Sequence, residues 1–264
     1  MCTSVPIPRA DKSLHLPKGQ RLVENPWRQM QGIKRATGGS RVIHHAGGRE
    51  LRIDGSFASW YEPGRIITGS VWDAIAAGLL AIPAVRRRKI LLLGLGGGSA
   101  ARLARAVAPR AEITGVEIDA QVVRLARQHF DLDDLGIRVV VDDACEVLRS
   151  GRGRFDAILE DVFVGTGDDA EKPAGFPVPG LSQAVRRLRP GGVLVSNALD
   201  DAPATARTLS ALLAHVVRIG IAGYDNRVFV ASRLPLTARG LRAAVAAEPL
   251  LGPTLSKLHF RSLR

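Results

Sequence analysis

The sequence predicts an α/β protein with a Rossmann-like, seven-stranded, mostly parallel sheet whose last strand is antiparallel, preceded by a small N-terminal β unit. From residue 89 onward, short apolar segments alternate with helical patterns, which is typical of a parallel sheet covered by helices on both faces. The stretch ILLLGLGGGSA, residues 90–100, combines a wholly apolar strand with a glycine-rich turn. Near the end of this pattern, the turn at 223–226 is too short for a crossover helix, so the strand after it must run antiparallel.

Each predicted element has its own local signal. The β unit consists of strands at 41–45, 50–53 and 56–61, with turns at Gly47-Gly48 and Asp54-Gly55. A helix at 70–80, with Ser70 as its N-cap, joins this unit to the main sheet. The strands of the main sheet are expected at 89–94, 112–117, 137–141, 155–160, 191–197, 215–221 and 226–232. The helices are expected at 98–108, 119–130, 143–150, 179–188, 202–213 and 237–247.

These elements and the charge pattern predict four regions. They are a basic irregular arm (1–40), a β-hairpin unit (41–68), a nucleoside-binding α/β domain (69–235) and a C-terminal helix with a basic tail (236–264). The net charge of +12 is concentrated at the two ends of the sequence. The arm lacks aromatic residues interleaved with its charges, so we interpret it as a solvated tail and expect no nucleic-acid partner.

Other signals are expected to be absent. No apolar run approaches the roughly 20 residues of a membrane span, and the N-terminus has no signal-peptide core. We therefore expect a cytoplasmic protein without a membrane partner. Two cysteines, and no cluster of His, Cys and acidic residues at metal-ligand spacing, predict that no metal is bound.

The polar groups of the predicted site follow four successive strands. In an open parallel sheet, ligands bind outside the carboxyl ends of the strands. The first strand ends in a turn containing Gly94, Gly96, Gly97 and Gly98, where the backbone can approach a ligand closely. Three acidic groups end the next three strands: Glu117, the pair Asp142-Asp143 followed by Ala144, and the pair Glu160-Asp161.

Glu117 lies at the spacing expected of a carboxylate that binds a ribose. An NAD-binding fold is the alternative, because GLGGGSA also fits a loose dinucleotide motif. The acids after the third and fourth strands and the closing antiparallel hairpin weigh against that alternative.

With these motifs the chain resembles the spermidine synthase-like family of the class I S-adenosylmethionine-dependent transferases. The resemblance covers roughly residues 49–232 and includes LRIDG, LLLGLGGGSA, GVEIDAQVV, VVVDDACEVL, FDAILEDVF and LRPGGVLVSN. It implies that residues 94–98 wrap the amino-acid or propylamine end of the nucleoside and that Glu117 holds the ribose. It also implies that Ile118 packs on adenine, that Asp143, beside Ala144, accepts from the adenine amino group, and that Asp161 faces the reacting centre. A homodimer through the β unit is a further implication.

The chain also departs from the aminopropyltransferases of that family. They resemble G-G-G-D-G-G at the turn, where the Asp holds a propylamine, and this chain has Gly97 there. Their Gln after the D-G of the β unit is Ala58 here, and their Tyr-His-Glu aligns with Trp72, Asp73 and Ala74. Their D-S-S-D loop is reduced to Asp161 followed by Val162, Phe163 and Val164. A polycationic acceptor needs several carboxylates in a partly buried cleft, so these losses disfavour it.

We therefore expect a methyltransferase that uses S-adenosylmethionine on a small-molecule acceptor of unknown identity, with Asp161 as the catalytic base or orienting group. The long segment 162–179 is expected to act as a lid. One alternative is a polyamine aminopropyltransferase that uses decarboxylated S-adenosylmethionine and has rebuilt its acceptor site from Asp73, Asp168, Asp169 and Glu171. Another is a non-catalytic nucleoside-binding protein.

Overall fold

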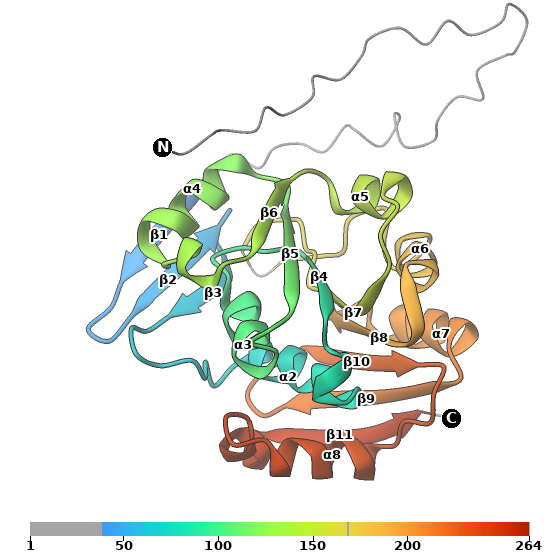
Figure 1. The fold of residues 1–264 in the computed structure, drawn as a ribbon. Helices are drawn as coiled ribbons and strands as arrows, with labels where there is room; N and C mark the ends of the chain where they lie inside the picture. The colour runs from blue at the N-terminus through green and yellow to red at the C-terminus, as the bar shows by residue number, and fades with distance from the viewer. Residues whose placement is uncertain (1–38, 168, 264) are drawn as a thin grey trace, which may run out of the picture. The chain divides into compact units, whose positions relative to one another are not determined.

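The computed structural model describes residues 39–167 and 169–263, which belong to one compact unit. Almost all of the basic arm predicted for 1–40 lies outside the described residues. Figure 1 shows a small sheet, β1 to β3, beside a larger sheet covered by helices. Within the described part of the chain, none of the helices has the length and apolar character that a membrane crossing requires.

The small sheet is antiparallel, with strand order β1-β2-β3. Its strands are Ser40–His44, Arg49–Ile53 and Ser56–Tyr61, close to the predicted bounds. Asp54 and Gly55 both have positive φ, 50° and 86°, which gives the tight hairpin turn that the Asp-Gly pair predicted. Leu51 and Tyr61 pack against Val122 and Phe130, so the small sheet shares a core with the helix that follows the second parallel strand.

The large sheet has the order β11-β9-β10-β8-β7-β4-β5-β6. The bounds are β4 Lys89–Leu93, β5 Glu112–Glu117, β6 Arg138–Val141, β7 Phe155–Glu160, β8 Leu188–Ala198, β9 His215–Ile221, β10 Arg227–Ser232 and β11 Leu258–Leu263. Strands β6, β5, β4, β7 and β8 are parallel, whereas β10 runs antiparallel to both β8 and β9. The predicted Rossmann-like class and the reversed last strand of the hairpin are confirmed.

Strand β4 shows why its apolar run had no alternation. Ile90 and Leu92 belong to one hydrophobic core, and Leu91 and Leu93 belong to the core on the opposite face. Because both faces are covered, the four positions after Lys89 are all apolar.

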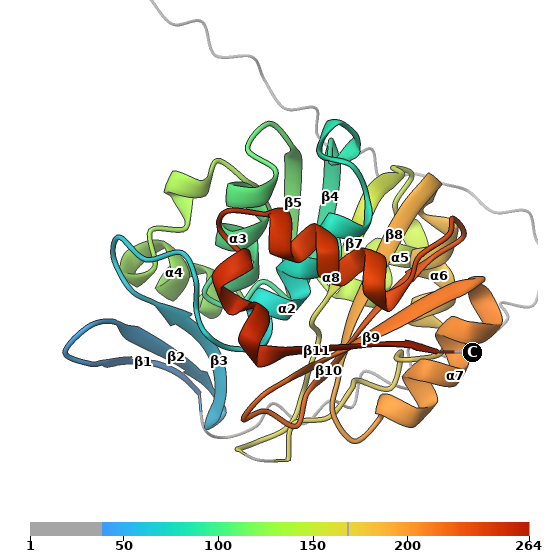
Figure 2. The same cartoon turned by 90° about the horizontal axis from the view of Figure 1, so that it is seen from below.

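The helices are α2 Val71–Gly78, α3 Ser99–Val107, α4 Ala120–His129, α5 Ala144–Ser150, α6 Gly180–Arg186, α7 Ala202–Leu212 and α8 Ala238–Ala247. The core on one face contains residues of α2, α3 and α8, and the core on the other contains residues of α5, α6 and α7. Figure 2 shows α8 and β11 close together beside β9.

Strand β11 is an eighth strand that the sequence analysis did not predict. Residues 258–263 were expected to lie in a basic tail. Instead, all six of them pair antiparallel with residues of β9. Its residues LHFRSL are only partly apolar, and most of them are half-buried or exposed. An edge strand of this kind lacks the continuous apolar run that identified the central strands, so its pattern was too weak to recognise.

Candidate active site

The glycine turn after β4 depends on residues without side chains. Gly94, Gly96 and Gly98 have φ values of 81°, 52° and 89°, in the left-handed region that favours glycine. A Cβ on Gly94 would lie 2.3 Å from the backbone oxygen of Asp161, at the end of β7. The turn and the end of β7 are therefore in direct backbone contact.

Gly97, in the same turn, packs against Ser59 of the small sheet. Its N–H donates to Ser59 Oγ at 2.7 Å, and a Cβ on Gly97 would lie 2.8 Å from Ser59 Cβ. Ser59 lies on β3 and is 1% exposed. A second link is formed one residue along β3, because Trp60 N–H donates to Ser99 Oγ while that hydroxyl donates to Trp60 O. The small sheet thus covers the turn and leaves no room for a side chain at residue 97.

Glu117 ends β5 and reaches back to the turn. One carboxylate oxygen accepts from Gly96 N–H at 2.8 Å and the other from Asp119 N–H at 3.2 Å. Burial raises the pKa of Glu117, and the backbone N–H donors oppose that shift. Each oxygen retains a lone pair, so the carboxylate can still accept hydroxyl groups of a ligand.

Two exposed apolar residues lie beside Glu117. Ile118 follows it directly, and Val141 is its partner in the register of β5 and β6. Ile118 is 58% exposed, although it follows the largely buried strand β5, and Val141, the last residue of β6, is 51% exposed. An apolar surface of this kind at the carboxyl edge fits a flat base better than it fits water.

Asp143 is the N-cap of α5, a role that the sequence analysis did not consider. One of its oxygens accepts from the N–H groups of Cys145 and Glu146. Its second oxygen makes no hydrogen bond with any other described residue. Ala144, the first residue of α5, is buried beside it. Asp143 can therefore cap the helix and still accept a hydrogen bond from a ligand.

Asp161 receives two side-chain hydrogen bonds, one at each carboxylate oxygen. Trp72 Nε1 donates at 3.1 Å and Asn197 Nδ2 at 2.7 Å. Asn226 Nδ2 donates to Asn197 Oδ1, which fixes the orientation of the Asn197 amide. Burial raises the pKa of Asp161, and the hydrogen bonds from Asn197 and Trp72 oppose this shift. A positioned carboxylate whose pKa is raised is suited to accept a proton.

Glu160 points away from Asp161 and is neutralised within the protein. Its side chain is completely buried, and Lys172 Nζ lies 2.5 Å from one oxygen while Ser196 Oγ donates to the other. The Lys172 ammonium is itself buried, donates to Val162 O, and lies 4.0 Å from the centre of the Phe163 ring. This ion pair joins the loop after β7 to the core of the sheet.

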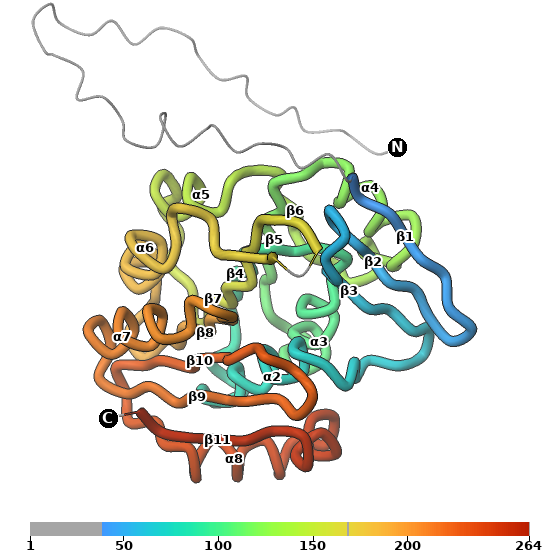
Figure 3. The backbone as a smooth tube through the Cα atoms, turned by 180° about the vertical axis from the view of Figure 1, so that it is seen from behind, coloured from blue at the N-terminus to red at the C-terminus, as the bar shows by residue number. Residues whose placement is uncertain are grey.

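The loop of residues 162–179 is also attached to the small sheet. Gly167 N–H donates to Asp54 O, and Ser56 Oγ donates to Gly167 O. Figure 3 shows the yellow chain after β7 reaching toward the small sheet. Val164 and Glu171 form a bridge within the loop. The predicted lid therefore spans from β7 to the β2–β3 hairpin.

Three of the carboxylates proposed for a rebuilt polyamine site can be placed. Asp73 accepts from the N–H groups of Thr68 and Gly69 and from the Thr68 hydroxyl, so it holds the turn before α2. Asp169 and Glu171 are exposed on the loop, and Asp168 lies outside the described residues. No cluster of three or more His, Cys, Asp or Glu in metal-binding arrangement occurs among the residues described.

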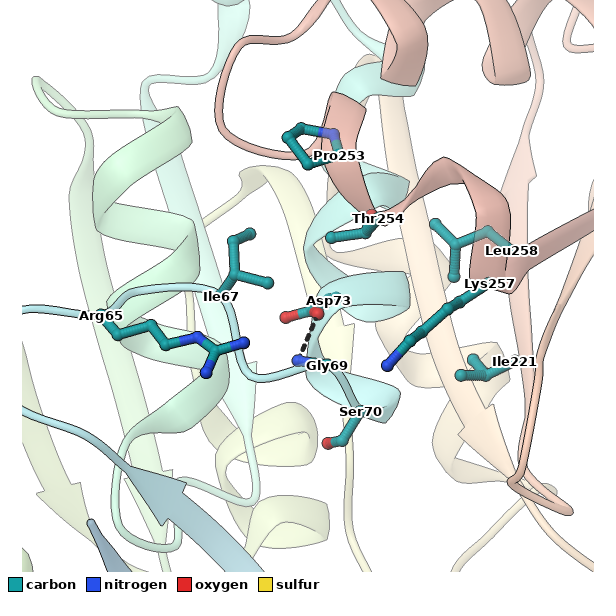
Figure 4. A pocket seen from close by; sticks show the side chains of 10 residues that line it. All are labelled: Arg65, Ile67, Gly69, Ser70, Asp73, Ile221, Pro253, Thr254, Lys257 and Leu258. Atoms are coloured by element: carbon teal, nitrogen blue, oxygen red, sulfur yellow. Dashed lines mark hydrogen bonds between the residues drawn. The ribbon is translucent and has the colours of Figure 1, made fainter. Parts of the chain in front are cut away.

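A cavity of about 190 Å³ beside Asp73 is separate from the predicted cofactor residues. Figure 4 shows Arg65 and Lys257 entering it from opposite sides, with Asp73 bonded to Gly69 between them. Asp73, from the alternative polyamine site, lines this cavity. None of the residues predicted to bind the cofactor, nor Asp161, lines it or a second cavity of about 370 Å³ next to Tyr61 and Arg102.

The sequence analysis missed three residues of this site: Ser59, Lys172 and Asn197. Asn197 lies near the carboxyl end of β8, so the same strand-end rule that found Asp161 could have found it. Ser59 and Lys172 carry no such signal, because their contacts join segments that are distant in sequence or lie in an irregular loop.

Comparison with known proteins agrees with this geometry. Residues 90–192 match the model of a methyltransferase domain. A probable polyamine aminopropyl transferase of Bifidobacterium longum is 35% identical over 133 residues, which are 50% of this chain and 28% of that protein. The chain thus aligns with well under half of this relative's length.

Solved structures extend the likeness to the fold. A probable spermidine synthase from Corynebacterium glutamicum superposes with a TM-score of 0.69 at 24% identity, covering 84% of this chain and 86% of that one. Human methyltransferase-like protein 13, in complex with SAH, gives a TM-score of 0.59 at 24% identity and covers 71% and 92%. The predicted resemblance to a spermidine synthase-like, class I methyltransferase fold is confirmed.

Replacing Gly97 by Ala tests the contact with the small sheet. The added Cβ would overlap Ser59, so we expect a loss of about 1–3 kcal/mol in the free energy of unfolding, measured with urea. Gly47→Ala is the matched control, because a Cβ there meets no atom within 4 Å and we expect little change. Equal effects of the two substitutions would contradict the packing described.

Replacing Lys172 by Met tests the buried ion pair. It leaves the buried Glu160 without its cation, so we expect a loss of about 3–5 kcal/mol at neutral pH. In this variant the pKa of Glu160 is raised above its unfolded value. The loss should therefore be smallest at a pH below the ordinary pKa of glutamate and grow as the pH rises through the folded value. The double variant Lys172→Met/Glu160→Gln should recover most of the stability. If it were as unstable as Lys172→Met alone, the interpretation would be refuted.

Proposed function

We propose that this chain, which has a spermidine synthase-like, class I S-adenosylmethionine-dependent methyltransferase fold, is a transferase that uses intact S-adenosylmethionine to methylate a small-molecule acceptor. The observation that carries the proposal is the contact between Gly97 and Ser59. The resemblance places an Asp at residue 97 in aminopropyltransferases, where it would hold a propylamine. Here residue 97 has no carboxylate, and Ser59 occupies the space that one would need.

The residues fit the cofactor in three respects. The backbone of the glycine turn and the Glu117 carboxylate lie together and can receive the amino-acid end and the ribose hydroxyls. Ile118 and Val141 offer an apolar surface to the adenine ring. The second oxygen of Asp143 can accept a hydrogen bond from the adenine amino group, with Ala144 beside it. These roles are our proposal for Gly94, Gly96, Gly97 and Gly98 and for the residues just named.

The charge of the acceptor site also favours methyl transfer. Glu160 is neutralised by Lys172, and Asp73 is bound to the turn before α2, so neither carboxylate is available to a second ammonium. Asp161 is the one carboxylate at the end of β7 without an ion pair among the described residues. A polycationic acceptor would need more negative charge than this, because a buried unpaired ammonium is costly.

In this mechanism, Asp161 accepts the proton that the acceptor loses. When bound, S-adenosylmethionine supplies an electrophilic methyl group on a sulfonium. Trp72 and Asn197 hold the Asp161 carboxylate in a fixed orientation, so that it can receive the proton that the acceptor's attacking atom loses. The loop of residues 162–179, fastened to Asp54 and Ser56, excludes water from this position.

Aminopropyl transfer is the second candidate, because the relative from Bifidobacterium and the Corynebacterium structure are named as polyamine enzymes. A cytoplasmic location and a homodimer through the small sheet also remain predictions.

Calorimetric titration with S-adenosylmethionine, and separately with its decarboxylated form, tests the proposal. We expect tighter binding of the intact donor, because the turn presents no carboxylate to repel it. Glu117→Gln is the control. Loss of the carboxylate should weaken the binding of both donors alike, by about tenfold or more. Preference for the decarboxylated donor would restore the aminopropyltransferase function, and binding without turnover on any acceptor would support a non-catalytic protein.

The pH dependence of turnover tests Asp161. Because its pKa is raised above the ordinary value, and a base acts when deprotonated, we expect activity to rise with pH along a limb above the usual range of aspartate. Asp161→Asn should abolish this limb and lower kcat by about 10²–10⁴-fold, measured as S-adenosylhomocysteine released with an acceptor found by screening.

Trp72→Phe is the companion variant for that profile. It removes one hydrogen bond that stabilises the carboxylate, so the limb should move to higher pH while activity is retained. An unchanged profile in both variants would remove Asp161 from the catalytic step.

A further inference from the structure

A group of basic residues lies at the edge of the large sheet opposite the predicted site. The segments 84–89, 110–112, 151–156, 186–191 and 232–235 lie where β4, β5, β7 and β8 begin and β10 ends. They contain eleven Arg and Lys and two acidic residues. Contacts join them: Arg86 donates to Pro190 O, and Asp156 accepts from the backbone of Arg88 and from Arg189. We call these segments the amino-edge face.

Part of this charge has a structural role. Helices that follow parallel strands end at this edge, where their last carbonyls lack helical donors. Arg87 donates to Val107 O at the end of α3, and Arg187 donates to Val147 O and Leu148 O in α5. Both acidic residues are also paired, Glu112 with Lys89 and Asp156 with Arg189.

Five arginines of the amino-edge face are not explained in this way. They are all exposed, and their side chains make no hydrogen bond or ion pair with the residues that the structure describes; they are Arg88, Arg110, Arg152, Arg186 and Arg233. Arg88, Arg110 and Arg152 precede β4, β5 and β7. Arg186 is the last residue of α6, before β8, and Arg233 follows the end of β10. Five guanidinium groups without an ion partner among the described residues make this edge strongly positive.

We infer that the amino-edge face binds the phosphate backbone of a double-stranded nucleic acid, without sequence preference. The planar guanidinium matches phosphate oxygens in geometry, and ten of the eleven basic residues are arginine. The aromatic residue of these segments, Phe155, is half-buried with Arg187 over its ring, so it is not free to stack on an unpaired base. An anionic membrane fits less well. Membrane binding needs a continuous apolar surface, and only two large apolar residues, Val85 and Leu234, are exposed in these segments.

This inference is independent of methyl transfer, because the carboxyl-edge site and the amino-edge face lie at opposite ends of the same strands. It revises the expectation, drawn from the basic arm, that no nucleic acid is bound. Residues 86–89 were visible as a basic run, but the other segments are up to about 145 positions further along the chain. Only the sheet order brings them together.

Fluorescence anisotropy with a labelled 20-base-pair duplex of arbitrary sequence tests the inference on the full-length chain. With five phosphate contacts, the affinity should fall about 500-fold between 50 and 200 mM salt. Arg88→Gln/Arg152→Gln/Arg186→Gln should bind more weakly at 50 mM salt and lose only about 12-fold over the same range.

The matched control is Arg41→Gln/Arg124→Gln/Arg207→Gln, which removes the same charge from exposed arginines outside the amino-edge face. We expect it to keep the wild-type salt dependence, and expect all three proteins to have the same urea midpoint. An equal loss in the control would show a non-specific effect of net charge and overturn the inference. Absence of binding at 50 mM salt, or preference for single strands or for vesicles containing one quarter phosphatidylglycerol, would also overturn it.

Discussion

The missing side chains of the glycine turn allow two distant segments to reach the same stretch of backbone. The carbonyl of Asp161 occupies the position where a Cβ of Gly94 would lie, and Ser59 occupies that of Gly97. The end of β7 and the small sheet are therefore positioned against one turn, and the carboxylates of Glu117 and Asp161 take their places around it. A side chain in the turn would separate these parts, and the proposed acceptor and cofactor sites would no longer be adjacent.

Strong local patterns explain how much could be predicted from the sequence. The strands β4 to β10 and their helices were predicted because buried parallel strands are continuously apolar and because glycine and Asp-Gly pairs mark turns. The strand-end rule found Glu117, Asp143 and Asp161 as candidates, and their roles remain predictions. Strand β11 and Lys172 could not be found in this way. The pairing of β11 with β9 and the burial of Lys172 against Glu160 depend on tertiary contacts that no local pattern records.

The direction of the strands also sorts the charges. Their carboxyl ends carry Glu117, Asp143 and Asp161, and at their opposite ends arginines donate to the last carbonyls of helices. The two edges of the large sheet therefore carry charges of opposite sign. Guanidinium groups at helix ends follow from the chain direction of α/β units, because the partial negative charge of each helix lies there.

The loop of residues 162–179 is held largely through backbone atoms. Gly167 uses its own N–H and carbonyl to contact Asp54 and Ser56, and Val164 pairs with Glu171 through the main chain. Among the described residues of the loop, Lys172 alone contacts the sheet through an ion pair. The side chains of Thr166, Asp169 and Ala170 can therefore change without breaking these contacts. If the proposed function holds, acceptor preference can diverge during evolution in this segment while the proposed nucleoside site and the scaffold stay the same.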